Sequence, residues 1–242
     1  TLFVYAETVT TPICSDERSF DITINTTPIV DTPADVSICD NYTLPALTNG
    51  NYFTGANGSG TPLNAGDEIT ASITLFVYAE SATTPNCSSE HSFDIAINTT
   101  PTVDTPADIS ECDSYTLPAL TNGNYFTASN GAGTALNGGD VISTSTTLFV
   151  YAESATTPNC SSEHSFDLSI IVTSNATFTQ LSPICEGDSL TLPTTSIEGF
   201  TGTWSPVFDN TISNTYNFTP DANQCAIGTT MTITVNPVFI AT

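Results

Sequence analysis

The chain has 242 residues, of which 39% are hydrophobic and only 11% are charged. Arg18 is the single Lys or Arg, and 25 acidic residues give a formal net charge of −24. This balance excludes a nucleic-acid-binding protein, which needs basic residues against phosphate, and it argues against an anionic membrane surface as partner. The hydrophobic fraction is too high for a disordered chain, so the acidic residues are interpreted as keeping a long exported protein soluble.

An internal repeat organises the whole sequence. The motif Thr-Leu-Phe-Val-Tyr-Ala-Glu begins at Thr1, Thr74 and Thr147, a period of 73 residues. Residues 26–98 and 99–171 are identical at 57 of 73 positions, with no gap. Because this period exceeds the roughly 20 to 50 residues of solenoid repeats, each copy is expected to bury its own core as a bead on a string.

The repeat sets the expected domain boundaries. We expect the C-terminal part of a truncated repeat at 1–25, complete repeats at 26–98 and 99–171, a diverged domain of the same class at 172–236, and the start of a following unit at 237–242. A sequence that starts and stops within its pattern is expected to be a window on a much longer protein.

The strand signals are clearest in the copy at 99–171. Residues 100–106 contain two prolines and are expected to form an edge strand or a linker. Short strands are expected at 113–118 and 124–127, and longer alternating strands at 147–153 and 165–170. Glycine-rich turn signals separate these strands, at 121–123, 128–133 and 137–140. With no helical periodicity, the pattern predicts an all-β chain of tandem immunoglobulin-like antiparallel β-sandwich domains.

Seven cysteines indicate a disulfide framework. Pairing inside each repeat predicts three bonds, which are Cys39 with Cys87, Cys112 with Cys160, and Cys185 with Cys225. Cys14 is then left unpaired in this window. Closing a loop of about 48 residues should stabilise a small domain by roughly 4 kcal/mol and implies an oxidising, extracytoplasmic setting. Zinc is the alternative, but no C-x-x-C motif occurs and the two histidines do not follow ligand spacing.

No residue pattern predicts an enzyme. His91 and His164 are one period apart, yet Arg18 occupies the equivalent position of the first copy. A catalytic histidine would not be exchanged for arginine in otherwise unchanged surroundings. No Gly-x-Ser-x-Gly motif occurs either. We therefore expect no catalytic residue and no cofactor.

Two groups of side chains suggest binding instead. Carboxylates near the start of each repeat are weak calcium candidates, because calcium takes several oxygen ligands but no Asp-x-Asp-x-Asp-Gly loop is present. They are Asp31, Asp35, Asp40, Asp104, Asp108 and Asp113. The aromatic pair Tyr52-Phe53, repeated at Tyr125-Phe126, could be a sugar-stacking platform. The alternative is one ring in the core and one at the surface.

Several motifs together resemble a known family. They are residues 74–93, the Leu-Asn-Gly-Gly-Asp-Val-Ile segment at 136–142, Pro-Ile-Cys-Glu-Gly-Asp-Ser-Leu at 183–190 and Gly-Thr-Trp-Ser-Pro at 202–206. The chain resembles, over essentially its whole length, the tandem immunoglobulin-like repeats of giant surface adhesins from Flavobacterium-like Bacteroidota. The resemblance implies export by the type IX secretion system, and membership of a group that includes gliding-motility adhesins.

The expected function is that of a non-enzymatic stalk or spacer in a large secreted cell-surface adhesin or filament. Its expected partners are neighbouring repeats of the same chain, with neither nucleic acid nor membrane insertion. Two alternatives stay open: a glycan- or partner-binding immunoglobulin-like module, and a subunit of a multi-chain extracellular fibre.

Overall fold

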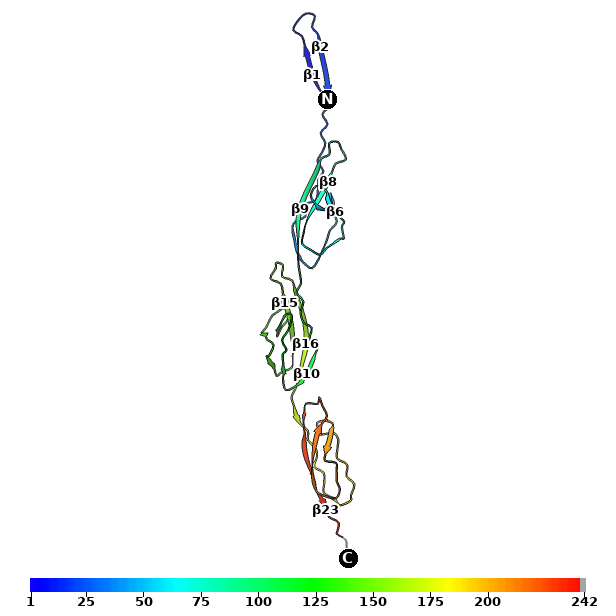
Figure 1. Cartoon of the computed structure of the whole chain (residues 1–242), viewed down its shortest axis with the longest axis vertical. Coiled ribbons are helices and arrows are strands. Elements are labelled where there is room, and N and C mark those ends of the chain that lie inside the picture. The colour runs from blue at the N-terminus through cyan, green and yellow to red at the C-terminus, as the bar shows by residue number, and fades with distance from the viewer. Residues whose placement is uncertain (240–242) are drawn as a thin grey trace. The chain divides into compact units, whose positions relative to one another are not determined.

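The computed structural model describes residues 1–239, and these form strands and loops with no helix among them. By its contacts the chain divides into two compact units. The first consists of Thr1–Pro101 together with Glu153–Ser161, and the second of Thr102–Ala152 together with Ser162 onward. Figure 1 colours the chain from blue at the N-terminus to red at the C-terminus.

The first unit contains a sandwich of two facing sheets and a separate two-stranded hairpin, β1–β2. Its strands are β1 (Leu2–Glu7), β2 (Ser15–Phe20), β3 (Val36–Cys39), β4 (Tyr42–Thr43), β5 (Asn51–Gly55), β6 (Ser59–Leu63), β7 (Glu68–Ile69), β8 (Ile73–Glu80) and β9 (Ser88–Asn98). One sheet has the order β3-β9-β8-β5-β6, and β4 pairs with β7 in the other. This is the predicted all-β sandwich, and β8 and β9 form its long central hairpin (Figure 1).

The edge strand β3 runs parallel to β9, whereas the remaining neighbours in the sheet are antiparallel. Its register places Val36 opposite Ile95 and Cys39 opposite Asn98. The predicted sandwich is therefore confirmed, with a parallel pair that the sequence pattern did not reveal. The consequence is that Cys39 lies at the C-terminal end of β9.

The core of this sandwich follows from the period-two pattern of its strands. Alternate side chains of a strand face opposite sides of the sheet, so Leu75 and Val77 of β8 point inward together and are 0% exposed. Tyr52 of β5 packs with them, as do Phe93 and Ile95 of β9. Burying each of these side chains contributes about 1.5–3 kcal/mol before the entropy cost of ordering the chain.

The second unit contains a copy of this sandwich, followed by the diverged segment. Its strands are β10 (Ile109–Cys112), β11 (Tyr115–Thr116), β12 (Asn124–Phe126), β13 (Ala135–Leu136), β14 (Val141–Ile142), β15 (Thr146–Glu153), β16 (Ser161–Ile171), β17 (Ser174–Asn175), β18 (Ile184–Cys185), β19 (Gly202–Ser205), β20 (Asn214–Pro220), β21 (Ala226–Ile227), β22 (Thr229–Ile233) and β23 (Val235–Asn236). The sheet β10-β16-β15-β12-β13 copies that of the first unit, and β11 pairs with β14.

The strand prediction for residues 99–171 was right for the long hairpin, and of the two alternatives expected for 100–106, an edge strand or a linker, the structure has the linker. No strand forms at 100–106, because Pro101 and Pro106 have no backbone N–H to donate to a ladder. The edge strand is instead β10, which pairs parallel to β16 with Cys112 opposite Ile171. The core of this copy contains Leu148 and Val150, both 0% exposed.

The diverged segment 172–236 has a third core of its own. The strands β19, β20 and β22 form one sheet, and β18 pairs parallel to β23. Tyr216, Met231 and Ile233 are buried between them. Trp204 packs against Phe178 and Phe218, with ring centroids 4.9 and 5.2 Å apart, so it covers this core from its edge.

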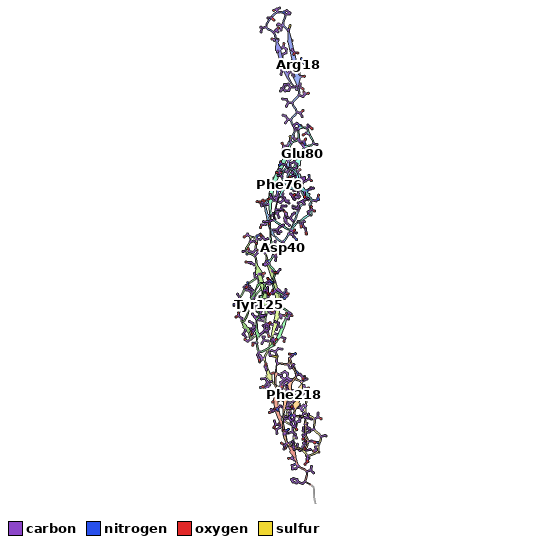
Figure 2. All side chains as sticks on the ribbon, viewed as in Figure 1. Arg18, Asp40, Phe76, Glu80, Tyr125 and Phe218 are labelled. Atoms are coloured by element: carbon purple, nitrogen blue, oxygen red, sulfur yellow. A yellow bond between two sulfur atoms is a disulfide. The ribbon has the colours of Figure 1, made fainter. Side chains whose placement is uncertain are left out.

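The hairpin β1–β2 carries the first copy of the repeat motif. Its Leu2 and Val4 are 51% and 60% exposed, although they correspond to the buried Leu75 and Val77. Arg18 also lies exposed on this hairpin (Figure 2). The domain boundaries remain predictions, and the one expected at 237–242 falls partly on residues 240–242, outside the described residues.

Candidate functional site

One disulfide joins the repeat copies 26–98 and 99–171, and a second joins the copy 99–171 to the diverged segment 172–236. Cys39 is bonded to Cys160, with a Cα–Cα distance of 5.7 Å, and Cys112 is bonded to Cys225 at 5.4 Å. The predicted pairs Cys39–Cys87, Cys112–Cys160 and Cys185–Cys225 are therefore wrong. We call Cys39, Cys112 and Cys185 the edge-strand cysteines, because each ends a parallel edge strand, and Cys14, Cys87, Cys160 and Cys225 the tip cysteines, because each lies in a hairpin tip.

The geometry of β9 explains why a repeat cannot bond to itself. Cys39 lies opposite Asn98 at one end of this strand, whereas Cys87 directly precedes Ser88 at the other end. A strand of 11 residues at about 3.3 Å per residue separates the two cysteines by over ~30 Å. A disulfide requires Cα atoms within about 7 Å, so the bond must go to a tip cysteine from another copy.

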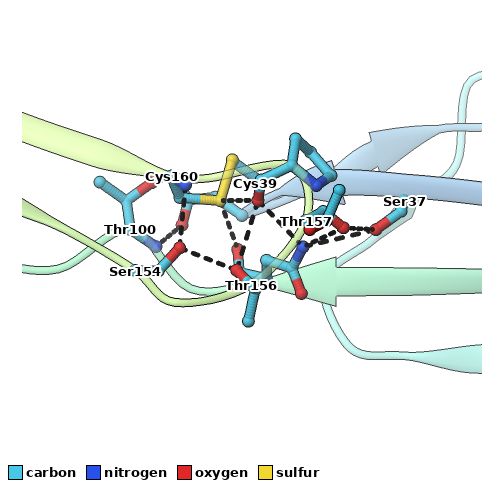
Figure 3. The surroundings of a disulfide bond; sticks show 10 residues. Ser37, Cys39, Thr100, Ser154, Thr156, Thr157 and Cys160 are labelled. Carbon is cyan, nitrogen blue, oxygen red and sulfur yellow. Dashed lines mark hydrogen bonds between the residues drawn. A yellow bond between two sulfur atoms is a disulfide. The ribbon is translucent and has the colours of Figure 1, made fainter.

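Hydrogen bonds hold the hairpin tip against the edge strand around the Cys39–Cys160 bond (Figure 3). Ser37 donates from Oγ to the carbonyl of Thr157 at 2.8 Å. The side-chain amide of Asn98 reaches the same carbonyl at 3.3 Å and that of Pro158 at 3.4 Å. Cys160 is 1% exposed, so the protein covers its side of the bond.

Hydrogen bonds inside the hairpin tip also hold the loop that carries Cys160. Ser154 donates its backbone N–H to the carbonyl of Cys160 at 2.8 Å, and the N–H of Cys160 returns a bond to Ser154 Oγ at 2.9 Å. This pair of bonds closes the loop that carries the cysteine.

The Cys112–Cys225 junction uses a different tip. Here the tip cysteine is followed by β21, which pairs parallel to β17, and Ser174 donates its N–H to the carbonyl of Cys225 at 3.1 Å. The residue opposite Cys112 is Ile171 rather than asparagine. Both junctions therefore tie an edge-strand cysteine to a hairpin of the following copy, with different supporting contacts.

An aspartate next to each bonded edge-strand cysteine fixes the connecting segment between copies. Asp40, at φ 64°, accepts bonds from the N–H and hydroxyl of Thr100 at 2.9 and 2.7 Å. Asp113, at φ 61°, accepts the same pair from Thr173 at 2.8 and 2.6 Å. These threonine bonds favour the charged carboxylate, so they hold the pKa of each aspartate below its ordinary value.

The other calcium candidates also accept bonds from the protein. Asp31 and Asp104 take the N–H groups of Thr48 and Thr121, both at 2.6 Å, and these bonds lower the pKa of both carboxyls. Asp35 accepts the backbone N–H of Asp94 at 2.8 Å, and Asp108 accepts that of Asp167 at 2.8 Å. Within residues 1–239 no group of three or more His, Cys, Asp or Glu side chains could hold a metal ion.

Three cysteines carry no disulfide: Cys14, Cys87 and Cys185. Cys14 was predicted to be unpaired, whereas Cys87 and Cys185 were predicted to be bonded, and that prediction is wrong. Cys87 keeps the surroundings of the bonded Cys160, since its Sγ lies 3.9 Å from the carbonyl oxygen of Asn25, as Cys160 Sγ lies 3.7 Å from that of Asn98. The tip cysteines Cys87 and Cys160 thus have the same local contact although only Cys160 is bonded.

The two histidines have structural contacts. Nε2 of His91 lies 2.9 Å from the carbonyl oxygen of Pro33, and Nε2 of His164 lies at the same distance from that of Pro106. Each ring therefore fastens the loop before the edge strand to the central hairpin. Arg18, at the equivalent position of the first copy, lies 3.4 Å from Asp16.

The Tyr-Phe pair divides between the core and the outer face. Tyr52 is 2% exposed, whereas Phe53 packs edge-on against Tyr78, with ring centroids 6.1 Å apart. Gly58 lies so close to the Tyr78 ring that an added Cβ would come within 2.8 Å of it. Tyr52 therefore lies in the core, whereas Phe53 is half-buried on the outer face of the sheet.

The carboxylate of Glu198, in the diverged segment, accepts hydrogen bonds from two neighbouring residues. It accepts the N–H of Thr177 at 2.8 Å, the Thr177 hydroxyl, and the hydroxyl of Ser196 at 2.8 Å. The Thr177 bonds are the main cause that lowers the pKa of Glu198 to about 2.

No helix in the described part of the chain is long and apolar enough to cross a membrane. The chain matches neither a protein-family model nor a curated protein sequence.

Several solved structures have a similar arrangement of strands. A titin I-band fragment, I67–I69, is 11% identical, with 88% of this chain and 99% of that chain covered and a TM-score of 0.32. Protocadherin gamma B2 domains 3–6 are 13% identical, with 70% and 58% covered and a TM-score of 0.28. Mouse cadherin-23 EC22–24 is 12% identical, with 88% of this chain and 100% of that chain covered and a TM-score of 0.27. The chain spans less than two thirds of the protocadherin gamma B2 chain, and at these TM-scores the likeness carries no argument about function.

Proposed function

We propose that the chain is a non-enzymatic structural segment of a large secreted surface adhesin, in which disulfides fasten each repeat to the next. The observation that carries this proposal is the pairing of Cys39 with Cys160 and of Cys112 with Cys225. Bonds between successive copies resist separation of the copies under tension, which is a property that a stalk needs and a catalyst does not.

The two disulfide loops overlap, and this limits how far the chain can extend. One loop runs from Cys39 to Cys160 and the other from Cys112 to Cys225, so residues 112–160 belong to both. The shortest covalent path from Cys39 to Cys225 crosses both disulfides and contains only these residues. At about 3.5 Å per extended residue, that path is about 170 Å long, against roughly 650 Å for the open chain.

The setting proposed for this segment is extracellular. Disulfides persist in oxidising compartments and are rare in the cytosol. The resemblance of the repeats to those of Bacteroidota surface adhesins supports placement on the cell surface and export by the type IX system. Lateral assembly into a multi-chain fibre and participation in gliding are not needed to account for the contacts within this chain.

Single-molecule stretching of the full chain tests the proposal. With the disulfides intact, the segment from Cys39 to Cys225 should extend to no more than about 170 Å at forces that unfold every repeat. After reduction, the same segment should lengthen about fourfold. An oxidised chain that extends like the reduced one would contradict the proposal.

A glycan-binding role is distinguished by a separate measurement. Glycan-array binding by the oxidised chain, lost on Phe53→Ala and Phe126→Ala, would favour a binding module instead. We expect no such binding, because Phe53 packs edge-on against Tyr78. Phe126 packs edge-on against Tyr151 in the same way, with ring centroids 6.0 Å apart.

A further inference from the structure

The two junction disulfides differ in how far the protein covers them. Cys160 is 1% exposed, whereas Cys39, Cys112 and Cys225 are half-buried. The Cys39–Cys160 bond therefore has one sulfur that is shielded from water. The Cys112–Cys225 bond joins two residues that both reach the surface.

Carbonyl oxygens lie close to the shielded sulfur of Cys160 (Figure 3). Its Sγ is 3.7 Å from the carbonyl oxygen of Asn98 and 3.8 Å from that of Pro158. The side-chain amide of Asn98 holds the tip in this position through its bonds to the carbonyls of Thr157 and Pro158. Because these oxygens carry partial negative charge, they repel an incoming thiolate anion.

The tip at the second junction is held differently and has a strained backbone. Ile171 lies opposite Cys112, and its side chain cannot donate the hydrogen bonds that Asn98 donates at the first junction. Cys225 has φ 48°, a left-handed conformation that costs free energy in a residue with a Cβ, whereas Cys160 does not have a positive φ. Opening the disulfide frees Cys225 to leave this conformation, which favours the reduced state.

The chemistry of thiol–disulfide exchange makes these differences important. A thiolate attacks one sulfur in line with the S–S bond and expels the other sulfur as a thiolate. At the first junction, burial blocks attack on Cys160, and attack on Cys39 would expel the Cys160 thiolate into a site without water, where an anion is costly. At the second junction either sulfur can be attacked, and either can leave towards water.

We propose that the Cys112–Cys225 bond is a redox-sensitive switch, which low-molecular-weight thiols open while the Cys39–Cys160 bond stays closed. The inference rests on the proposed function, because it concerns the same two junctions and adds their regulation. It assigns the two bonds different tasks. The first is a permanent fastening, and the second is a fastening that the thiol concentration outside the cell controls.

The reaction consumes two molecules of the small thiol for each bond opened. The first thiolate forms a mixed disulfide with one of the two cysteines and releases the other as a thiolate. A second thiolate attacks the small-molecule sulfur of this mixed disulfide and releases the remaining cysteine. The protein gains two electrons and two protons, and the two small thiols become one small disulfide.

Opening the switch changes the length to which the chain can extend. The shortest covalent path from Cys39 to Cys225 then crosses the Cys39–Cys160 bond and contains residues 160–225. At about 3.5 Å per extended residue this path is about 230 Å long, against about 170 Å with both bonds closed. Opening Cys39–Cys160 alone would instead route the path through residues 39–112 and make it about 260 Å long. The switch thus gives the segment an intermediate length, far below that of the open chain.

The order of reduction tests the inference in the full-length chain. The three unbonded cysteines are first replaced so that they cannot exchange with the disulfides, by Cys14→Ser, Cys87→Ser and Cys185→Ser. The folded, oxidised protein is treated with reduced glutathione, and samples are alkylated over time and mapped by mass spectrometry. We expect Cys112 and Cys225 to become modified several-fold faster than Cys39 and Cys160. Equal rates, or faster opening of Cys39–Cys160, would overturn the inference.

A substitution between the two junctions tests why the rates differ. Asn98→Ile copies the residue at 171 and removes the amide that holds the Cys160 tip. It should speed reduction of Cys39–Cys160 several-fold and leave the rate at Cys112–Cys225 unchanged. Asn25→Ile is the matched control, because it makes the same change at the equivalent position of the first copy, away from both bonds. An effect of Asn25→Ile as large as that of Asn98→Ile would contradict the assigned role of Asn98.

Stretching the partly reduced chain separates the inference from the proposed function. After glutathione treatment the segment from Cys39 to Cys225 should extend to about 230 Å, and an extension of about 260 Å would show that the wrong bond had opened. If mapping before treatment finds both bonds and they then open at equal rates, the switch is wrong and the proposed function stands. If the two bonds are absent before treatment, the proposed function fails as well.

Discussion

Cys39 and Cys87 lie at opposite ends of β9, so the two cysteines of one repeat face away from each other. Each can bond only to another copy, and Cys39 does so through Cys160. The consequence is mechanical: the disulfides fasten copy to copy, and each sandwich relies on its own apolar core to stay folded.

Removing one junction disulfide should destabilise the chain. Cys39→Ser/Cys160→Ser is expected to lower the free energy of unfolding by about 2–5 kcal/mol, because the bond restricts a long loop of the unfolded chain. Calorimetry of the thermal transition measures the change. Cys87→Ser is the matched control, since Cys87 has no disulfide, and it should shift stability by less than about 0.5 kcal/mol. Equal effects of the two changes would contradict the assigned bonds.

The aspartates beside the junctions should protect specific amides. Asp40→Asn keeps a residue that tolerates positive φ but removes the charge that strengthens the bonds from Thr100. Hydrogen exchange of the Thr100 amide should therefore become faster, with that of Thr173 unchanged. Asp113→Asn should do the reverse. An unchanged rate at Thr100 in the first variant would show that Asp40 does not hold the connecting segment.

Acid should weaken the diverged segment through Glu198. Its folded pKa of about 2 lies below the ordinary value of 4.5, so its contribution to stability is present above pH 4.5 and is lost as the pH falls towards 2. Glu198→Gln should therefore be less stable than the unaltered chain at pH 7, with the difference shrinking towards pH 2. Urea unfolding followed by Trp204 fluorescence reports on this segment. Glu186→Gln, which removes an exposed carboxylate from the same diverged segment, is the control.

Calcium should leave stability unchanged. The six candidate carboxylates accept backbone N–H groups from the protein, and these bonds already orient their oxygens. The melting temperature should be the same with millimolar Ca²⁺ and with chelator. A saturable rise with Ca²⁺, removed by Asp40→Asn or Asp104→Asn, would contradict this account.

The sequence predicted the sandwich because its strongest signals are local. Alternation along 147–153 marks the face that buries Leu148 and Val150, and no partner strand needs to be known to see it. The sequence also indicated that His91 has a structural role and not a catalytic one, because arginine replaces it in the first copy. Its contact with the carbonyl of Pro33 is consistent with this prediction.

The disulfide pattern could not be found in this way, because it depends on which strands are neighbours. Cysteine spacing along the chain suggests the pair Cys39–Cys87, but the parallel register that puts Cys39 opposite Asn98 is a long-range feature. One signal was present in the sequence: an 11-residue strand directly follows Cys87, and its length alone separates the two ends of a repeat. The edge strand at 109–112 was missed because four residues give too short an alternation.

Disulfide mapping of the oxidised chain tests the central claim most directly. The protein has one Arg and no Lys, so proteases that cut at acidic residues are used without reduction, followed by mass spectrometry. We predict linked peptides that contain Cys39 with Cys160 and Cys112 with Cys225, and free thiols at Cys14, Cys87 and Cys185. Peptides linking Cys39 to Cys87 or Cys112 to Cys160 would contradict the account, because the repeats would then be closed on themselves.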